Sequence, residues 1–418
     1  MKKKTIFIHL PAYRDPELIP TIKDALAKAK HPKNLRFGIC HQYNPEDTFD
    51  DLSEFENDKR FKIDKILYTN AKGLPYARQR INDMITDETY ILQLDSHHRF
   101  AENWDETLIN MHSKLEKEGF KPILTGYLPL YDPFNDPAGR SMDPWLQHFV
   151  CFYPHGTIFI RPSGIPDWKN LKGPVRSRFL SGHFCFARTE WAKTIKHDPD
   201  IYFSGEEINL TVRSFTHGYD MFHPHVLVIW HSTMREERAG KLSWDDEHKR
   251  GVDTNAHQTR GRAKIRQLFR TEDNGFDLTG YDIGTERTIR DYEEYAGFDF
   301  KRRAVQKYTL DYKYPPNPKV DDWEASLCTS FYNLISFDKT NFKLKDYEYM
   351  VCAYDDENGN NIQRQDFQKH EIEKFMAQPG NWVHFERHFL TEKKPYKWVI
   401  WAYSKSQGWA ERLEHIIQ

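Results

Sequence analysis

Apolar strand segments alternate with amphipathic helical segments through the first half of this sequence, and few folds accommodate that pattern. The segments predicted as strands are Thr5–Leu10, Asn34–Tyr43, Phe61–Asn70 and Thr89–Leu94. The segments predicted as helices are Pro16–Lys30 and Gly73–Ile85. Because strands joined through helices run in the same direction, the pattern predicts a layered α/β domain on a mostly parallel, Rossmann-like sheet.

The segment between Leu128 and Gly173 interrupts this alternation. It is rich in proline, glycine and aromatic residues, a composition that favours a long loop of the kind that covers binding sites. The remaining predicted elements are helices at Asn103–Gly119 and Ser204–Gly218 and strands at Pro122–Tyr127, Arg178–Arg188 and His225–Ser232. The sheet is therefore expected to continue on the far side of this loop.

The chain has 418 residues, more than a single core usually serves, so two domains are expected. Tyr312–Trp323 has the proline density of a linker. The tail after it combines aromatic, strand-like segments with a glycine and asparagine turn. We predict an α/β domain over 1–310 and a small, mainly β accessory domain over 318–418.

Charge, hydropathy and cysteine content restrict the partners and the compartment. Lysine plus arginine (60) nearly balance aspartate plus glutamate (62), so no global charge favours nucleic acid or an anionic membrane. No apolar run approaches the ~20 residues of a membrane-spanning helix, and none near the start is long enough for a signal peptide. The five cysteines are scattered and lack a CxxC pair, which favours a reducing compartment. We therefore expect a cytoplasmic protein with no membrane partner.

The most apolar predicted strand ends in Asp95-Ser96-His97. Residues two apart in an extended segment point to the same side, so Asp95 and His97 form half of a site for a divalent transition metal, with Ser96 turned away. His231 ends a later strand and offers a third ligand at the edge of the sheet. An aspartate that caps the next turn and a histidine near the surface would give the same spacing.

Two other histidines, His223 and His225, compete with His231 as ligands. They precede the later strand, so they are expected at its opposite end. Glu206 and Glu207 stand in the first turn of a predicted helix. Acids at this position stabilise the helix dipole by ~0.5 kcal/mol and need no further role unless a cleft surrounds them.

Gly73 stands at the beginning of another predicted helix, which carries two arginines, Arg78 and Arg80, two positions apart. A helix amino terminus with basic groups nearby suits a phosphate, although a solvated basic face would look the same. Pro11-Ala12-Tyr13 follows the first strand and would either pack against a flat base or make a proline turn.

Together these pieces resemble the metal-dependent GT-A glycosyltransferases. The shared features are D-x-H after the fourth strand, "GLPYAR" one helix earlier, "GEE" downstream and a histidine that closes a late strand. The sequence is most similar to the GlcNAc-transferase family of cytosolic enzymes that glycosylate hydroxyproline, and more distantly to the polypeptide N-acetylgalactosaminyltransferases. The likeness runs from Thr5 to Lys307 and includes a closing segment at Gly284–Phe300.

The resemblance implies a role for each candidate residue. Manganese, or magnesium, would be held by Asp95, His97 and His231. A UDP-sugar donor would be bound by Pro11, Ala12, Tyr13, Arg14, Gln42, Gly73, Arg78, Ser96, Ser181, Gly182 and His183. The acids at the reacting centre would be Glu206, the favoured one, and Glu207. The base-pocket strand ends in "CHQY" where distant relatives have acidic residues, so a diphosphate is indicated more strongly than a particular base.

The implied activity is transfer of GlcNAc or a similar hexose, with retained configuration, to a hydroxyl on a protein or glycan. An arginine and a divalent ion would offset the charge that develops on the leaving diphosphate. Two alternatives stay open. The basic run Gln258–Arg270 would suit a glycosyltransferase that modifies bases in DNA, and the tryptophan-rich tail would suit a sugar-binding module without catalysis.

Overall fold

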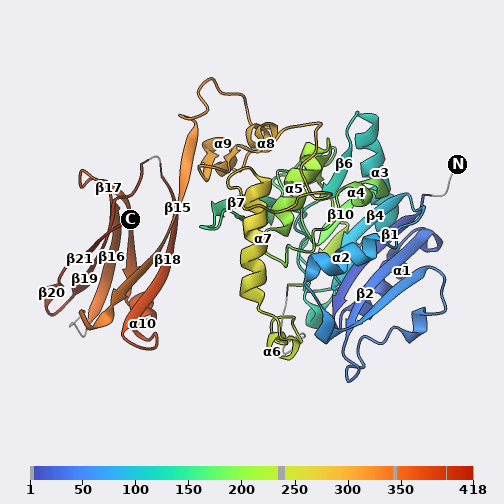
Figure 1. The fold of residues 1–418 in the computed structure, drawn as a ribbon, viewed down its shortest axis with the longest axis horizontal. Coiled ribbons are helices and arrows are strands. Elements are labelled where there is room, and N and C mark those ends of the chain that lie inside the picture. Colours follow the sequence, from blue (N-terminus) through green and yellow to red (C-terminus); the bar gives the residue numbers. More distant parts are fainter. Residues whose placement is uncertain (1–3, 234–240, 342–345, 392, 418) are drawn as a thin grey trace. The chain divides into compact units, whose positions relative to one another are not determined.

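The computed structural model describes residues 4–233, 241–341, 346–391 and 393–417, which form two compact units (Figure 1). The first unit comprises Met1–Val150, His155–Lys301 and Tyr308–Lys319. The second comprises Cys151–Pro154, Arg302–Lys307 and Val320–Gln418. Among the described residues, no helix has the length and apolar content needed to cross a bilayer.

An eight-stranded sheet forms the centre of the first unit, in the order β3-β2-β1-β4-β10-β6-β11-β9. Its strands are β1 (Ile6–Tyr13), β2 (Leu35–Tyr43), β3 (Phe61–Leu67), β4 (Tyr90–Leu94), β6 (Pro122–Thr125), β9 (Val175–Arg176), β10 (Phe184–Arg188) and β11 (Asp220–His223). β1 to β4 are mutually parallel and β11 is parallel to β6, whereas β10 and β9 run antiparallel to their neighbours. This mixed α/β architecture with a mostly parallel sheet confirms the predicted fold class.

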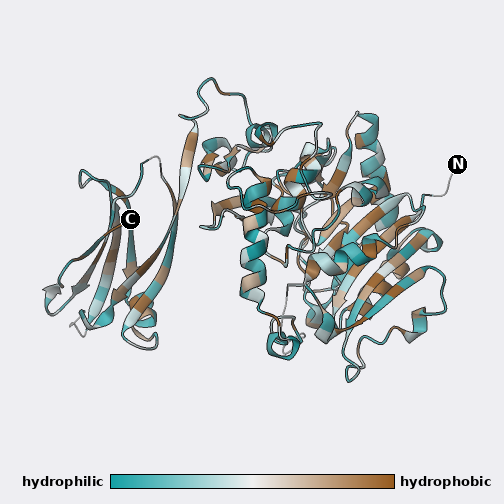
Figure 2. Cartoon of the chain, in the orientation of Figure 1, coloured by the Kyte–Doolittle hydropathy of each residue, from teal (hydrophilic) through white to brown (hydrophobic). Residues whose placement is uncertain are grey.

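Helices pack against this sheet, chiefly the second to the fifth in chain order, and buried residues of the first helix share its core. The helices are α1 (Leu18–Lys28), α2 (Leu74–Asn82), α3 (Trp104–Lys117), α4 (Thr189–Thr194), α5 (Glu206–Thr216), α6 (Glu247–Arg250), α7 (Thr254–Leu268), α8 (Ile289–Ala296) and α9 (Lys307–Leu310). Figure 2 shows hydrophobic segments along the central strands and mixed faces on the helices. All five residues of β4 are buried, which explains why this strand is apolar along its whole length.

Two predictions of secondary structure were inaccurate. The proline-rich segment expected to be irregular contains a hairpin of β7 (Trp145–Phe152) and β8 (Ile158–Gly164). The late strand is short: β12 covers only Ile229–His231 and pairs antiparallel with β5 (His98–Phe100) outside the main sheet. Its length is set by that three-residue partner, which lies far away in the sequence.

The second unit contains two antiparallel sheets and a separate core. One sheet holds β14 (Ala304–Gln306), β15 (Leu327–Asp338) and β18 (Trp382–Thr391). The other holds β16 (Tyr347–Asp355), β17 (Asn361–Gln368), β19 (Lys397–Ser404), β20 (Gly408–Trp409) and β21 (Leu413–Ile416). The second unit also contains α10 (Lys369–Met376). Buried residues such as Ile335, Cys352 and Ile400 form the core of this unit. The short strand β13 (Phe298–Asp299) belongs to the first unit.

Candidate functional site

A cavity of about 560 Å³ in the first unit is lined by residues at the carboxyl ends of β1, β2 and β4. These parallel strands end at the same edge, which is where α/β sheets bind ligands. Eight predicted site residues line it: Pro11, Tyr13, Gln42, Gly73, Asp95, Ser96, His97 and His231. Further lining residues to which the sequence assigned no role include Asp15, Tyr202, Trp244 and Arg250.

Asp95, His97 and His231 meet at the wall of this cavity. One ligand atom from each lies within 4.8 Å of the others. Asp95 Oδ2 is 3.6 Å from His231 Nε2 and 3.9 Å from His97 Nε2. The pairing of β12 with β5 explains the meeting, because it sets His231 opposite His98, three residues after Asp95.

Asp15 lies behind the histidine of the D-x-H triplet. Its Oδ2 is 2.7 Å from His97 Nδ1 and also accepts a hydrogen bond from the Ser96 hydroxyl. A carboxylate on one ring nitrogen orients the other nitrogen toward a metal and raises its basicity. One carboxylate and two imidazoles, supported in this way, suit Mn²⁺ better than Mg²⁺, because Mg²⁺ prefers oxygen ligands only. Sequence reasoning missed Asp15, although it follows β1 at the same sheet edge.

Arg78 links Asp95 to the Gly182 loop and to Glu206. Its side chain is buried, and its guanidinium donates to Asp95 Oδ1 at 2.7 Å and to the Gly182 carbonyl, with Glu206 Oε1 3.3 Å from Nε. Burial opposes ionisation of Asp95, but His231 and Arg78 outweigh it and hold the pKa of that carboxyl well below its usual range. His231 and Arg78 therefore keep the carboxylate of Asp95, a candidate metal ligand, charged.

The two glutamates at the start of α5 have different partners. Glu206 is buried, and its Oε1 lies 3.3 Å from Arg78 Nε and 3.2 Å from His197 Nδ1. Glu207 is half-buried and accepts hydrogen bonds from the Tyr127 hydroxyl (2.7 Å) and the Gly182 amide (2.8 Å). Burial raises the pKa of Glu207 to about 7, against the opposing effect of these two donors.

The predicted sugar loop, Ser181 to His183, precedes β10 and lies against the group of candidate metal ligands. The Ser181 amide donates to Thr125 Oγ1 at 2.8 Å. The Gly182 carbonyl accepts from Arg78 and from Gln93 Nε2. The imidazole of His183 stacks on that of His231. Among the described residues that line the cavity, none comes from this loop.

Near the end of β1, some side chains line the cavity and others bind groups away from it. Ala12 is buried, and its carbonyl accepts from Gln42 Nε2 at 3.3 Å. Arg14 turns away from the cavity and binds Asp47 and Asp246, each at 2.7 Å. The Tyr13 hydroxyl also donates to Asp246, at 3.0 Å. Asp246 thereby fixes the segment that leads into α6, a connection with no signal in the sequence.

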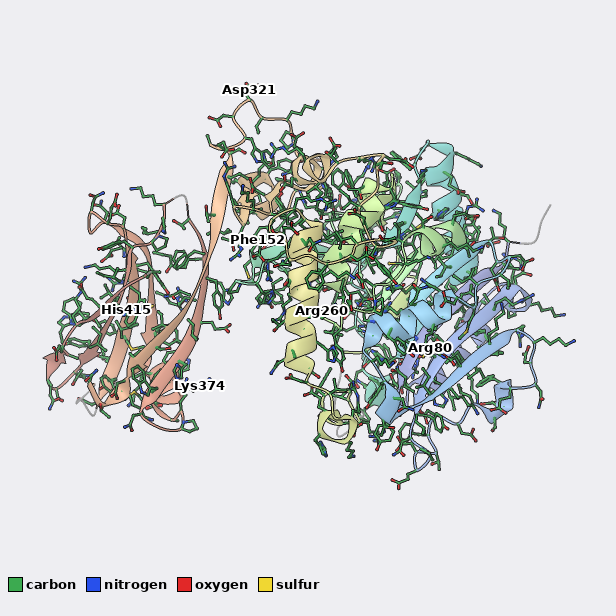
Figure 3. The ribbon with its side chains drawn as sticks, viewed as in Figure 1. Arg80, Phe152, Arg260, Asp321, Lys374 and His415 are labelled. Atoms are coloured by element: carbon green, nitrogen blue, oxygen red, sulfur yellow. The ribbon has the colours of Figure 1, made fainter. Side chains whose placement is uncertain are left out.

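The competing candidates lie elsewhere. His223 is buried in β11, and its Nδ1 lies 2.9 Å from the Thr125 carbonyl. His225 is half-buried after that strand, and neither histidine belongs to the metal-binding group found among the described residues. Arg80 projects from α2 (Figure 3) and pairs with Asp64 of β3 at 2.9 Å. Its charge is thus balanced within the protein.

Comparison with known proteins bears on this geometry. A family model described as Glycosyltransferase (GlcNAc) matches residues 5–64 and 51–302. No curated protein matches the chain significantly. The crystal structure of GalNAc-T7 with UDP, GalNAc and Mn²⁺ is similar with a TM-score of 0.51 and 12% identity, over 98% of this chain and 69% of that chain. S. aureus TarS in complex with UDP-GlcNAc gives a TM-score of 0.38 and 14% identity, over 55% of this chain and 59% of that chain. At 12% identity the likeness to GalNAc-T7 concerns the fold, which agrees with the GT-A class.

Proposed function

We propose that this chain, which belongs to the Glycosyltransferase (GlcNAc) family, transfers a sugar from a UDP-sugar to an acceptor hydroxyl with the help of a divalent metal ion. The family membership confirms the predicted resemblance and makes the chain a glycosyltransferase. The meeting of Asp95, His97 and His231 at the cavity wall is the observation that carries the metal-dependent form of the proposal. The structure of GalNAc-T7 contains UDP, GalNAc and Mn²⁺, which supports this choice of donor and ion.

Asp95, His97 and His231 would hold the ion. Once bound, the ion would offset the negative charge that develops on the leaving diphosphate. Arg78 keeps Asp95 charged and, through Gly182, fixes the loop beside the ligand cluster. Pro11, Tyr13 and Gln42 line the cavity and are our candidates for contact with the nucleotide base.

We assign the role of binding and deprotonating the acceptor hydroxyl to Glu207. The sequence had favoured Glu206 for this role. Glu206 is engaged by Arg78 and His197, so we give it the task of holding Arg78 in place. Glu207 is partly exposed and has a pKa near 7, which suits a group that exchanges a proton with an acceptor hydroxyl. Retention of configuration is proposed from the family resemblance.

The acceptor is proposed to be a hydroxyl on a protein or a glycan. The DNA alternative depended on the basic run in α7, and several of its cations have acidic partners. Lys264 is buried between Asp198 and Asp200, and Arg266 pairs with Glu272 at 2.7 Å. Arg260, labelled in Figure 3, remains exposed on α7 but lies 3.6 Å from Asp200. The neighbouring acids lower the net positive charge that α7 presents, which makes it less suited to bind a phosphate backbone.

The proposed compartment is the cytoplasm. No disulfide joins the five cysteines Cys40, Cys151, Cys185, Cys328 and Cys352, all of which lie in described parts of the chain. Cysteines without disulfides suit a reducing environment. Fractionation of cells that express the full chain would test this assignment.

Release of UDP tests the proposed function. The full chain is incubated with Mn²⁺ and, in turn, UDP-GlcNAc, UDP-GalNAc and UDP-glucose, and chelation of the metal is expected to abolish release. Asp95→Asn and His97→Ala are expected to lower turnover by more than about 100-fold because each removes a ligand. His225→Ala, which alters a half-buried histidine outside the ligand group, serves as the control. Turnover that persists in both ligand variants, or after chelation, would refute the metal site.

A further inference from the structure

Two histidines that are not part of the predicted metal site lie against His231. The imidazole of His183 is parallel to that of His231, with 4.1 Å between ring centroids and 4° between ring planes. The ring of His98 lies 4.9 Å from His231 at an angle of 41°. His183 therefore covers one flat face of the ligand ring.

The ring of His183 is itself fixed. The Leu128 amide donates to His183 Nε2 at 3.2 Å, so this nitrogen carries no proton. The proton of the neutral ring is then on Nδ1, which lies 3.2 Å from the Ser181 hydroxyl oxygen. The Tyr127 ring also stacks on His183, with centroids 5.2 Å apart. A side chain held at both nitrogens and stacked on its neighbours cannot rotate freely.

We propose that His183 is a positioning residue for the metal ligand His231. Its fixed plane restricts rotation of the His231 ring and keeps Nε2 directed at Asp95, 3.6 Å away. The adjacent Gly182 carbonyl binds Arg78, which in turn binds Asp95. One short loop thus orients two of the three ligands. This inference rests on the proposed function, because it presumes that the ligands bind a divalent ion.

Two variants distinguish a positioning role of His183, which needs a flat ring, from a role in which the side chain only fills space. His183→Phe keeps a flat ring, whereas His183→Leu fills a similar volume without one. Neither side chain can accept the Leu128 amide hydrogen, so that loss is common to both. His112→Leu is the matched control, because it removes a fully buried imidazole from α3, away from the ligands.

The experiment measures Mn²⁺ binding to the full chain without nucleotide, from the electron paramagnetic resonance signal of free Mn²⁺, together with melting temperatures in chelator. We expect His183→Leu to raise the Kd for Mn²⁺ by about 10-fold or more, the usual effect of losing support behind a ligand. His183→Phe is expected to stay within about 3-fold of wild type, and His112→Leu to leave the Kd unchanged, because its side chain is outside the ligand group.

Three other outcomes would contradict the positioning role, and one of them would also contradict the metal site. Equal Kd values for His183→Leu and His183→Phe would overturn the positioning role, whatever happens to the melting temperature. Wild-type protein that binds no Mn²⁺ in the binding assay, and whose UDP release does not respond to chelation, would refute the metal site of the proposed function and this inference with it. Wild-type binding that is lost in Asp95→Asn but unaffected in His183→Leu would refute this inference alone.

Discussion

Glu206 and Glu207 are neighbours in the chain but have unlike environments, because successive residues of a helix point about 100° apart. Glu206 faces Arg78 and His197, both buried, whereas Glu207 faces Gly182 and Tyr127. The sequence shows two acids in a first turn, and the preference for Glu206 drawn from it took no account of these environments. Their ranking depends on α2 and the loop before β10, which reach this point only through the fold.

The raised pKa of Glu207 predicts an effect on stability. Its carboxyl titrates near 7 in the folded chain instead of 4.5, so folding takes up a proton between these pH values and stability falls as the pH rises through them. Glu207→Gln removes this dependence. We expect the unfolding free energy of the variant to rise relative to wild type by at most about 3 kcal/mol from pH 4.5 to pH 7.5. Denaturant titrations at several pH values measure it. The control is Glu190→Gln, at an exposed site on α4, and parallel curves for Glu207→Gln and wild type would contradict the prediction.

At the scale of elements, the sequence predicted what depends on local pattern. The alternating segments gave β1 to β4 with α1 and α2 close to their observed positions, and the abrupt end of β4 indicated Asp95 and His97. Pairing between distant segments was not predictable in the same way. The insertion of antiparallel β10 between β4 and β6, and the pairing of β5 with β12, depend on contacts between residues more than fifty positions apart. Asp15 and Asp246 were missed for that reason.

The beginning of α2 illustrates how an element fixes the site. Gly73 has φ +99°, and a Cβ there would lie 2.7 Å from the Tyr202 carbonyl oxygen, which accepts the Leu74 amide hydrogen. Gly119 has a similar φ of +92°, but no described atom lies within 4 Å of the corresponding Cβ position. Alanine carries the backbone cost of a positive φ, about 1–3 kcal/mol, at both positions. Gly73 also has ψ 168°, in a region that essentially only glycine adopts, so alanine there adds a conformational cost to the clash.

We predict that Gly73→Ala lowers the unfolding free energy by at least about 1 kcal/mol more than Gly119→Ala. Because Gly73 and Tyr202 both line the cavity, the same substitution is expected to raise KM for the UDP-sugar, and Gly119→Ala is expected to leave KM unchanged. Denaturant titration and initial-rate measurements check the two parts. Equal losses of stability in both variants would show that the contact with Tyr202 relaxes without cost.

At the scale of the whole molecule, each compact unit has its own hydrophobic core. The core of the first unit includes Ile8 on β1, and that of the second includes Ile400 on β19; both side chains are fully buried. The chain passes between the units several times, since the second includes Cys151–Pro154 and Arg302–Lys307 as well as the tail. The unit to which these short segments belong depends on contacts between distant residues, which composition does not encode. The domain bounds predicted from the proline-rich linker, 1–310 and 318–418, stay a prediction.

Separate cores predict two unfolding transitions, of which only one responds to ligands of the proposed active site. UDP with Mn²⁺ is expected to raise the melting temperature of the first unit alone, since a ligand stabilises only the structure that binds it. Ile8→Ala should lower that same transition, and Ile400→Ala should lower the other, each through a loss of about 2–5 kcal/mol. Differential scanning calorimetry of the full chain measures both transitions. UDP release by Ile400→Ala, assayed below its lowered transition, is expected to equal that of wild type. A single transition shifted by both substitutions would mean that the two cores unfold cooperatively, and the accessory unit would then contribute to the stability of the donor site.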